Sequence, residues 1–474
     1  MDPPYPDGLN SSHQNEEHSL PFDPQAALLL AMICHSYDRW LPPESNRIVA
    51  PASLGIQMHV SFLKRPWSAF LVTAALGCLA IASGAVVEVR LHALLPQLKV
   101  SLSTPTPVVA PGVPPQFRWP TQGQAAVAIP SLSMNAIAST PDERAVPIAS
   151  LAKLMTAYLV LQRFPLAIGS PGPVLTMTIQ DQQQYDNDVA EDQSSVEVTA
   201  GERLTEYQLL QALLTRSANN VAQLLSSWVA GSESSFVAEM NQTAHRMHLT
   251  NTHFADASGF NPETKATAQA VATVAAMDMR NSVFDQIVDE HTVTLPLIGT
   301  LPNIVARIGT ANVIGIKSGY TIWSGGCAAI ATVERTASGA MPAVAIVLDQ
   351  QGPGSLHHAA TIAEQLADEA GSSVVRVIGA RAHHVLGSIH IPWLRNPNST
   401  ANLTLSRGFN AVLWPGQKIT YHLHLKASTT LLGSSLGVVA GYLVASWPMH
   451  TEKIPVTTSR AIPLPTSWWR IEHG

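Results

Sequence analysis

The chain has 474 residues and a net charge of −6, with 13% charged and 46% hydrophobic residues. This length exceeds one ordinary domain, so we expect two or three folded units. The mildly acidic balance, without a run of Lys and Arg, argues against nucleic acid as a partner. The three cysteines, Cys34, Cys78 and Cys327, are too scattered for a disulfide framework or a metal site, and we expect them to be packing residues.

Residues 1–67 precede a long apolar stretch and are expected to be cytoplasmic. Residues 1–57 are rich in Pro, Ser and Asn and have no sustained periodicity, which predicts disorder. Met58 opens MHVSFLKRPW, which resembles an ordinary basic start of a membrane segment. We therefore hypothesise that the true start is Met58.

Residues 68–90 predict a transmembrane anchor. Ser68 to Val87 carry no charge over a length that matches a membrane-spanning helix. Because Lys64 and Arg65 precede it, the positive-inside rule places the N-terminus in the cytoplasm and everything beyond Arg90 outside. A cleaved secretory signal, with small residues at 82–85, is the alternative, and the protein would then be secreted.

Residues 91–121 form a Pro-rich linker, expected to be extended and semi-rigid. From 122 to 372 the pattern of apolar and polar residues is that of a folded domain. Two short strands are expected within 123–139, a buried helix after Ser150, and helical periodicity from Thr205 to Val229. Further expected elements are a helix at 234–249, strands at 311–321, 325–336 and 341–350, and a closing helix at 357–370. This order predicts a sheet built from both ends of the segment, with a helical insert between them.

Residues 373–474 predict a small all-β domain. Short alternating or apolar runs are separated by turn residues such as Pro415-Gly416, as in a small sandwich or barrel. His422 and His424 alternate on one face of an expected strand. No third ligand has a suitable spacing, so we interpret them as the polar face of that strand rather than as a metal site.

The buried helix carries a residue pair that suggests catalysis. Ser150 and Lys153 stand in its first turn, three residues apart and so on one face. A serine hydroxyl needs an adjacent base to become a nucleophile. Lys153 is such a base only if its pKa falls by several units, and burial, a second cation and the helix N-terminus all act in that direction.

Two further motifs follow in the chain. Ser217-Ala218-Asn219 stands at the end of a helix or loop, and Lys317-Ser318-Gly319 stands on an expected strand. Each motif alone is a weak signal. Ser-x-x-Lys, Ser-x-Asn and Lys-Ser/Thr-Gly in this order are together typical of penicillin-binding proteins and β-lactamases.

Residues 122–372 resemble the serine D-alanyl-D-alanine carboxypeptidases, the low-molecular-mass penicillin-binding proteins of peptidase family S11. The resemblance lies in IASLAKLMTAY (148–158), RSANNVA (216–222), FVAEMNQTAHRMHLTNTHFADASGFNP (236–262) and GIKSGYTIWSGGCAAIA (315–331). Asn220 stands where the family often has Asp, and Ser318 where Thr is commoner. The linker, FRWPTQGQAAVAI (117–129) and the terminal LPTSWWRIEHG (464–474) resemble a variety from Gram-positive bacteria with a β-rich C-terminal domain.

The resemblance implies an α/β (α+β) catalytic domain of the β-lactamase/transpeptidase type, with an antiparallel sheet and a helical subdomain. It also implies a penicillin-binding enzyme that removes the terminal D-alanine from peptidoglycan stem peptides ending in D-Ala-D-Ala. The catalytic residues would be Ser150 as nucleophile, Lys153 as its base, and Ser217 as a relay of the proton to the departing D-alanine. The substrate-binding residues would be Asn219, Lys317, Ser318, Gly319 and Tyr320, with the backbone N–H groups of Ser150 and Tyr320 as the oxyanion hole.

The resemblance implies that the protein needs no metal and no organic cofactor. It also implies that the protein's partners are the stem peptide, β-lactam antibiotics and the membrane. Three alternatives stay open. A β-lactamase would need a glutamate in the loop at 250–267, which offers only Glu263 outside the usual Glu-x-x-Leu-Asn pattern. A catalytically inactive cell-wall-binding membrane protein is disfavoured by the intact motifs. The motifs do not exclude a related endopeptidase or esterase.

Overall fold

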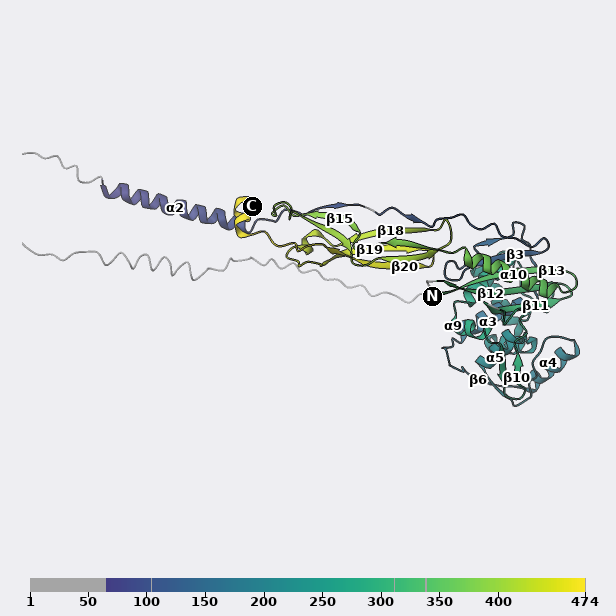
Figure 1. Ribbon diagram of the computed structural model, residues 1–474. Coiled ribbons are helices and arrows are strands. Elements are labelled where there is room, and N and C mark those ends of the chain that lie inside the picture. Colours follow the sequence, from purple (N-terminus) through teal and green to yellow (C-terminus); the bar gives the residue numbers. More distant parts are fainter. Residues whose placement is uncertain (1–64, 104, 311, 337–338, 474) are drawn as a thin grey trace, which may run out of the picture. The chain divides into compact units, whose positions relative to one another are not determined.

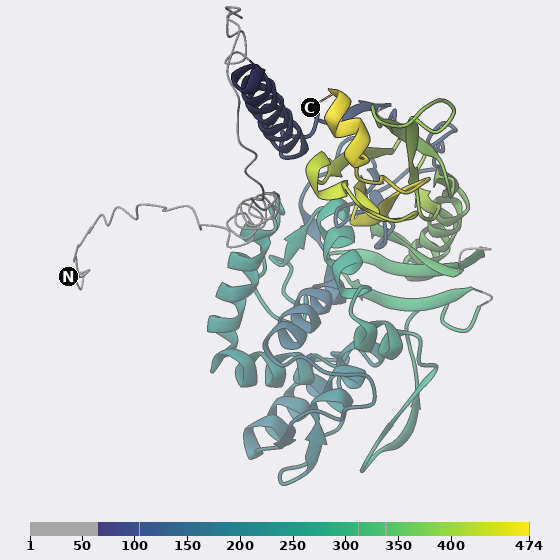
Figure 2. The same cartoon turned by 90° about the vertical axis from the view of Figure 1, so that its left-hand side faces the viewer.

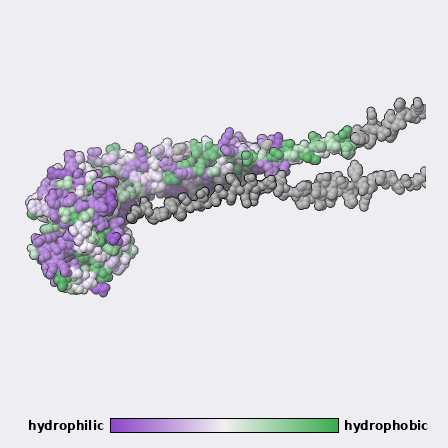
Figure 3. Space-filling model, turned by 180° about the vertical axis from the view of Figure 1, so that it is seen from behind, coloured by the Kyte–Doolittle hydropathy of each residue, from purple (hydrophilic) through white to green (hydrophobic). Residues whose placement is uncertain are grey.

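The computed structural model describes residues 65–103, 105–310, 312–336 and 339–473. The expectations of a disordered N-terminus and of a start at Met58 lie outside these residues, as does Cys34. The described chain begins with α2 (Arg65–Leu91), whose apolar surface is visible in Figure 3. Within the described chain, Phe70–Leu91 is the one helix long and apolar enough to cross a membrane.

The catalytic-type domain is built on a five-stranded antiparallel sheet in the order β11-β12-β13-β3-β4 (Figure 1). These strands are β11 (Val313–Thr321), β12 (Gly325–Thr336), β13 (Gly339–Gln350), β3 (Gln124–Ala128) and β4 (Ala138–Ser139). The sheet therefore joins the two ends of the domain's sequence, as the order of elements predicts.

The two faces of this sheet follow the two-residue period of a strand. Ala125 and Val127 of β3 pack with α10 (Ser355–Ser372) on one face, while Ala126 and Ala128 pack with the helical region on the other. All four side chains are fully buried. Their small size lets helices lie close to both faces of the sheet.

A helical region, seen below the sheet in Figure 2, fills the insert between β4 and β11. Its helices are α3 (Ala152–Arg163), α4 (Ile179–Ala190), α5 (Glu206–Thr215), α6 (Asn219–Ala230), α7 (Glu233–Arg246), α8 (Ala268–Asp278) and α9 (Ser282–Val288). Short ladders also occur there: β5 (Val146–Pro147) with β8 (Lys265–Ala266), β6 (Val174–Thr176) with β7 (Arg203–Thr205), and β9 (Thr292–Leu295) with β10 (Gly299–Pro302).

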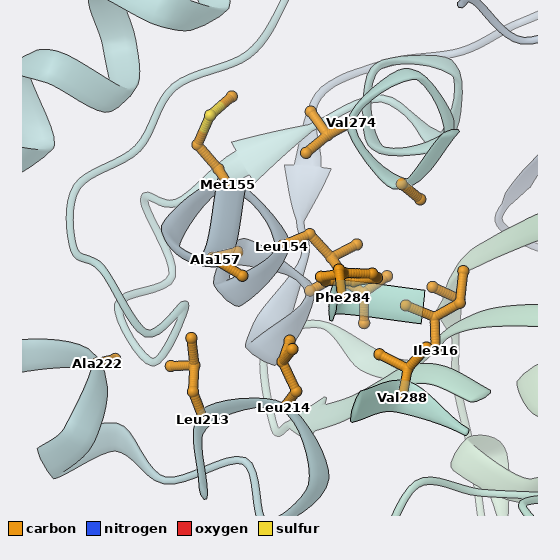
Figure 4. Close-up of a cluster of buried hydrophobic side chains, with 14 of the residues drawn as sticks. Leu154, Met155, Ala157, Leu213, Leu214, Ala222, Val274, Phe284, Val288 and Ile316 are labelled. Atoms are coloured by element: carbon orange, nitrogen blue, oxygen red, sulfur yellow. The ribbon is translucent and has the colours of Figure 1, made fainter. Parts of the chain in front are cut away.

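Helix α3 is the centre of this region's core. Leu154, Met155 and Ala157 point from it toward side chains of four helices and of the sheet (Figure 4). The surrounding residues include Leu213, Leu214, Ala222, Val274, Phe284, Val288 and Ile316. Burial of α3 on nearly every side fixes the place of the residues in its first turn.

The structure divides the helical run expected from Thr205 to Val229. Helix α5 begins with a capping box in which Thr205 and Gln208 satisfy each other's backbone N–H groups. It ends at Thr215, and α6 begins only at Asn219. The break falls on Ser217, whose φ of 62° is incompatible with a right-handed helix.

The C-terminal β domain contains a seven-stranded sheet in the order β1-β15-β16-β20-β19-β18-β2, in which β1 is Lys99–Leu102 and β2 is Val108–Val109, and β14 pairs with β17 beside it. These strands are β14 (Val375–Ala380), β15 (Val385–His390), β16 (Thr400–Leu405), β17 (Phe409–Leu413), β18 (Lys418–Leu425), β19 (Val439–Trp447) and β20 (His450–Thr458). The turn η2 (Ser428–Leu431) and helix α11 (Ser467–His473) complete the domain. His422 and His424 lie on the exposed face of β18, as a polar face requires.

Part of the stretch expected to be a linker belongs to this sheet. Strand β1 (Lys99–Leu102) pairs with β15, and β2 (Val108–Val109) pairs with β18. The expected spacer is therefore partly hydrogen-bonded structure. Its partner strands come from the far end of the sequence, so the linker's composition alone could not indicate this pairing.

Candidate active site

Ser150 occupies a constrained turn directly before α3. It is the middle residue of the 3-10 turn η1 (Ala149–Leu151). Ala149 has a φ of 48°, in the left-handed region that residues with a Cβ atom rarely adopt. A Cβ atom on Gly259 would lie 1.8 Å from the Ala149 carbonyl oxygen, so the loop at Gly259 packs directly on this turn. The tertiary structure thus holds the backbone beside Ser150 in a conformation that an isolated helix would not keep.

Lys153 is fully buried and has three hydrogen-bond partners. Its Nζ lies 3.1 Å from Ser150 Oγ, 2.6 Å from Asn219 Oδ1 and 2.8 Å from the Ser258 carbonyl oxygen. The carbonyl of Ser258 can only accept a hydrogen bond. A neutral amine therefore donates its two protons to Asn219 and Ser258, and its lone pair is left facing the Ser150 hydroxyl.

The environment of Lys153 favours that neutral amine. Burial lowers the pKa of Lys153 from 10.5 to about 7, although the carboxylates of Asp256 and Asp188 act to raise it. The neutral form is then abundant near neutral pH, which a general base requires.

The amide of Asn219 is oriented from both sides. Its Nδ2 donates to Gln193 Oε1 at 2.6 Å, and Gln193 Nε2 in turn donates to Glu191 Oε2 at 2.7 Å. A carboxylate accepts only, so this chain of bonds turns the oxygen of Asn219 toward Lys153. Next to it, Asn220 exchanges two hydrogen bonds with the backbone of Val196 and so holds the loop that carries Gln193.

The third motif lies on β11 against the turn of Ser150. Lys317 is almost fully buried, and its Nζ donates to the Ser318 carbonyl oxygen at 2.8 Å. Burial, and secondarily the charge of Lys153, hold the pKa of Lys317 well below its ordinary value. Ser318 Oγ accepts a hydrogen bond from the Ala306 N–H at 3.1 Å. A Cβ atom on Gly319 would lie 2.7 Å from the Ser150 nitrogen, so only glycine permits this approach of strand and turn.

Ser217 and Tyr320 complete the set expected from the sequence. Ser217 is buried, and its hydroxyl has no hydrogen-bond partner among the described residues. The Tyr320 side chain is exposed, and its backbone follows Gly319 on β11, where Tyr320 pairs with Gly326 of β12. The structure shows direct hydrogen bonds among Ser150, Lys153 and Asn219, and it seats Gly319 of β11 against Ser150.

The loop at 250–267 completes the site; sequence reasoning included it in the family resemblance but gave neither Ser258 nor Asp256 a role there. Besides Ser258, it contains Asp256, which accepts hydrogen bonds from the backbone N–H of Phe260 at 2.9 Å and from the hydroxyls of Ser258 and Thr264 at 2.6 and 2.5 Å. These bonds give the loop a fixed shape. The family resemblance and the run of small and polar residues marked the loop, but neither reveals which carbonyl faces Lys153.

Glu263, the carboxylate that a β-lactamase interpretation requires, is exposed. It pairs with Lys265 at 3.0 Å and forms no hydrogen bond with Ser150 or Lys153. Cys327 is buried near the site, and burial raises the pKa of its thiol to about 12. It is therefore a packing residue, not a competing nucleophile.

The relatives that this sequence matches are named as D-alanyl-D-alanine peptidases. The D-alanyl-D-alanine carboxypeptidase DacD of Escherichia coli is 30% identical over 37% of this chain and 46% of its own length. This chain therefore spans less than half of that relative. A D-alanyl-D-alanine endopeptidase of Pseudomonas aeruginosa is 28% identical over 54% of this chain and 81% of its own length.

Solved structures share the fold. The peptidoglycan synthesis regulatory factor PBP3 of Streptococcus pneumoniae matches with a TM-score of 0.53 and 20% identity, over 73% of this chain and 100% of its own. Penicillin-binding protein 6B of Escherichia coli matches with a TM-score of 0.50 and 19% identity, over 77% of this chain and 100% of its own. At these identities the likeness establishes architecture alone: the catalytic-type domain has the fold of penicillin-binding proteins.

The family model of the D-alanyl-D-alanine carboxypeptidases, peptidase S11, matches residues 115–352, which contain every residue of the site described above. This match covers half of the chain, and the fold agrees with it. The chain belongs to the D-alanyl-D-alanine carboxypeptidase family.

Proposed function

We propose that this chain is a penicillin-binding serine carboxypeptidase that removes the terminal D-alanine from peptidoglycan stem peptides. The observation that carries the proposal is the position of Lys153. Its buried Nζ lies 3.1 Å from Ser150 Oγ, and its other two partners accept its protons. This arrangement makes a serine nucleophile without a histidine.

In the acylation step, Ser150 Oγ attacks the carbonyl carbon between the two D-alanines while Lys153 Nζ takes the hydroxyl proton. The backbone N–H groups of Ser150 and Tyr320 donate to the oxyanion. The carbon–nitrogen bond then breaks, and Ser217, with Lys317 near it, relays the proton held by Lys153 to the departing amine, which leaves Lys153 neutral again. The products are free D-alanine and an acyl-serine, which water hydrolyses to restore Ser150.

The substrate roles follow from β11. Burial favours a neutral Lys317 in the free enzyme, but the terminal carboxylate of the substrate favours its ammonium form, so Lys317 then supplies positive charge for that carboxylate. The Ser318 hydroxyl is a hydrogen-bond partner for the same carboxylate. The absent side chain of Gly319 lets the peptide lie along the strand as an added strand. Both ends of the Asn219 amide already have partners, so we propose that it orients Lys153 as well as the substrate amide.

We also propose that α2 anchors the enzyme in the cell membrane and that the catalytic domain lies outside the cytoplasm. The support is the apolar helix Phe70–Leu91 together with the basic residues that precede it. A family of enzymes that act on the cell wall is consistent with that location.

The test of the proposed function combines two measurements on the purified protein. After a pulse of penicillin, intact-mass spectrometry should show an adduct that lasts for minutes or longer and that is absent from Ser150→Ala. In parallel, a D-Ala-D-Ala peptide should release D-alanine. A deacylation barrier about 4 kcal/mol higher than that of a β-lactamase corresponds to release roughly a thousandfold slower. Rapid loss of the adduct without release of D-alanine would instead identify a β-lactamase.

An endopeptidase is the second candidate, because the Pseudomonas relative that carries this name matches over most of its length. An endopeptidase uses the same acyl-serine chemistry on a cross-linked peptide. Incubation with a linear D-Ala-D-Ala peptide and with a cross-linked dimer separates the two. Faster cleavage of the cross-linked dimer would identify the enzyme as an endopeptidase.

A further inference from the structure

The two domains carry opposite net charges. Residues 122–372 contain 11 Lys and Arg against 23 Asp and Glu, a net charge of −12, whereas residues 373–474 contain nine Lys and Arg against two Asp and Glu, a net charge of +7. The whole chain carries −6, so its total charge hides a strongly basic β domain. Such an asymmetry between two parts of one chain indicates that the basic part meets an anionic partner.

The structure gathers part of this positive charge on the exposed face of the seven-stranded sheet. On β18, Lys418, His422 and His424 alternate with residues that point into the core, so their side chains lie on the same exposed face. Strand pairing puts Val444 of β19 opposite His422, and Lys453 of β20 opposite Val444. The exposed Lys453 therefore lies on this face as well. We call Lys418, His422, His424 and Lys453 the basic face.

No carboxylate of the sheet balances this charge. The seven strands, all of which the structure describes, contain one acidic residue, Glu452. Glu452 lies opposite the buried Ala445, and therefore on the other face of the sheet, and it pairs with Arg407. Within the described part of the chain, neither Lys418 nor Lys453 forms an ion pair. The positive charge of the basic face is thus free to meet an anion from outside.

Hydroxyl groups accompany these cations. Thr420, Ser446 and Thr451 form a row across β18, β19 and β20 on the same face. The hydroxyl oxygens of Ser446 and Thr451 lie 3.3 Å apart, and Thr420 Oγ1 donates to the Ser446 carbonyl oxygen at 3.2 Å. A hydroxyl group both donates and accepts hydrogen bonds, whereas a lysine ammonium only donates. The face can therefore bind hydroxyl groups of a ligand as well as its anionic groups.

The charges are spread over a length that suits a chain rather than a single small ion. Lys418 and His424 stand six residues apart on one strand, which corresponds to about 20 Å. Lys453 stands two strands away from them, which corresponds to about 10 Å. The basic face contains no Arg, the residue whose planar fork holds one carboxylate or phosphate with two parallel bonds. We therefore expect several separate contacts along a polyanion.

A polymer fits this face better than a membrane surface does. Elements that lie on a membrane insert exposed apolar side chains between the lipids, beside their basic residues. None of the residues of β18, β19 and β20, which the structure describes in full, is a large exposed apolar side chain. The Tyr442 ring, which shares the face, is only partly exposed and packs under Lys453, whose Nζ lies 4.3 Å from the ring centre.

Resting on the proposed location outside the cytoplasm, we propose that the basic face binds a linear polyol phosphate of the cell envelope, which lies along β18. Its phosphate groups lie against the two ammonium groups and against the imidazole N–H groups, each of which is a donor to phosphate oxygen. Its hydroxyl groups meet the row of Thr420, Ser446 and Thr451. The polymer then holds the enzyme within the envelope without occupying its catalytic site.

The test uses the full chain in phosphatidylcholine nanodiscs and a fluorescent poly(glycerol phosphate) as the probe, with binding followed by fluorescence anisotropy. Binding at low salt should weaken at least about tenfold when NaCl is raised from about 50 to about 500 mM, because a bound polyanion has released counterions. Neutral dextran should not compete. Absence of binding, or competition by dextran, would overturn the proposal. Stronger competition by phosphatidylglycerol vesicles than by unlabelled polymer, at equal phosphate concentration, would replace the polymer by a membrane surface.

Two triple variants assign the binding to the basic face. The first combines Lys418→Gln, His422→Gln and Lys453→Gln, and it should bind the polymer at least about tenfold more weakly at low salt. The control neutralises three exposed basic residues of the same domain outside the seven-stranded sheet, and it should keep wild-type affinity: Arg376→Gln, Arg381→Gln and His383→Gln. Equal affinities of the two variants would refute the assignment.

The same variants separate this inference from the proposed function. Both should keep wild-type penicillin labelling and D-alanine release, because the basic face lies in the β domain and contains no residue of the catalytic site. Native circular dichroism spectra check that both variants fold. Loss of polymer binding with intact catalysis supports the basic face, whereas wild-type protein that binds the polymer but releases no D-alanine would overturn the proposed function alone.

Discussion

The pH dependence of acylation offers a direct test of Lys153 as the base. Its pKa is lowered from 10.5 to about 7, and only the neutral amine accepts the Ser150 proton. The neutral fraction is about 1% at about pH 5, half at about pH 7 and nearly complete at about pH 9. The acylation rate should therefore rise about fiftyfold over the first interval and only about twofold over the second.

The assay is the second-order rate constant for acylation by a fluorescent penicillin, measured under single-turnover conditions across this pH range. An unburied lysine would give a rate that still rises about tenfold per pH unit above neutrality. A midpoint near 10, or a flat profile, would refute the reasoning. Lys153→Met should be unable to acylate at any pH while its circular dichroism spectrum stays native.

The carboxylates near Lys153 supply a second perturbation of the same profile. The charge of Asp188 acts to raise the pKa of Lys153, so the isosteric Asp188→Asn should move the midpoint to lower pH. Glu239→Gln, which removes a distant carboxylate, should leave the midpoint in place. A shift of the midpoint to higher pH in Asp188→Asn would show that a group other than Lys153 controls the rise of the acylation rate with pH.

Three further predictions concern stability, backbone geometry and topology. Glu206 is fully buried, neither of its oxygens has a hydrogen-bond partner among the described residues, and burial raises its pKa to about 7. The folded wild type therefore loses stability as the pH rises from about 4.5 to about 7. Above that pH window, Glu206→Gln should raise the free energy of unfolding in urea by up to about 3 kcal/mol over the wild type, and below it the two proteins should be equally stable. Gly259→Ala should abolish penicillin labelling, because its Cβ would lie 1.8 Å from the Ala149 carbonyl oxygen. The control Gly231→Ala has a φ of 80° but open space around its Cβ, so it should keep labelling and lose only about 1 kcal/mol of stability. Equal labelling of the two variants would contradict the role of the loop at Gly259. Val113 is 81% exposed, so Val113→Cys in a Cys78→Ser background should react with a membrane-impermeant thiol reagent on whole cells. Protection of that cysteine until the cells are lysed would contradict an extracytoplasmic domain.

The elements that the sequence predicts best are those whose signals are local. Thr205 as a helix start needs only its own hydroxyl and Gln208 three residues on, and the structure has this capping box. The strands of the central sheet are long apolar runs bounded by turns, and they occur where expected. The three motifs could be placed in order because each depends on the identity of adjacent residues.

What the sequence could not indicate depends on contacts between distant segments. The break at Ser217 interrupts a helical pattern that continues on both sides, and only packing around a residue at a φ of 62° maintains it. Helix α4 has a largely polar sequence without a clear apolar stripe, so its periodicity carries no signal. The carbonyl of Ser258 is invisible to any residue pattern, because every residue has a carbonyl and only the fold decides which one meets Lys153.

The pairing of β1 and β2 with strands from the C-terminal region has a consequence for the order of folding. The catalytic-type domain is inserted into the β domain, because Lys99 pairs with His390 and Val109 with Lys418. During synthesis from the N-terminus, the inserted domain can fold while residues 99–109 still wait for partners roughly 290 residues away. Closing that loop through an unfolded chain is entropically unfavourable, whereas a folded insert shortens the flexible path. The β domain should therefore fold last, and a chain that stops after residue 372 would carry a folded catalytic domain behind two unpaired strand segments that are free to pair with another molecule.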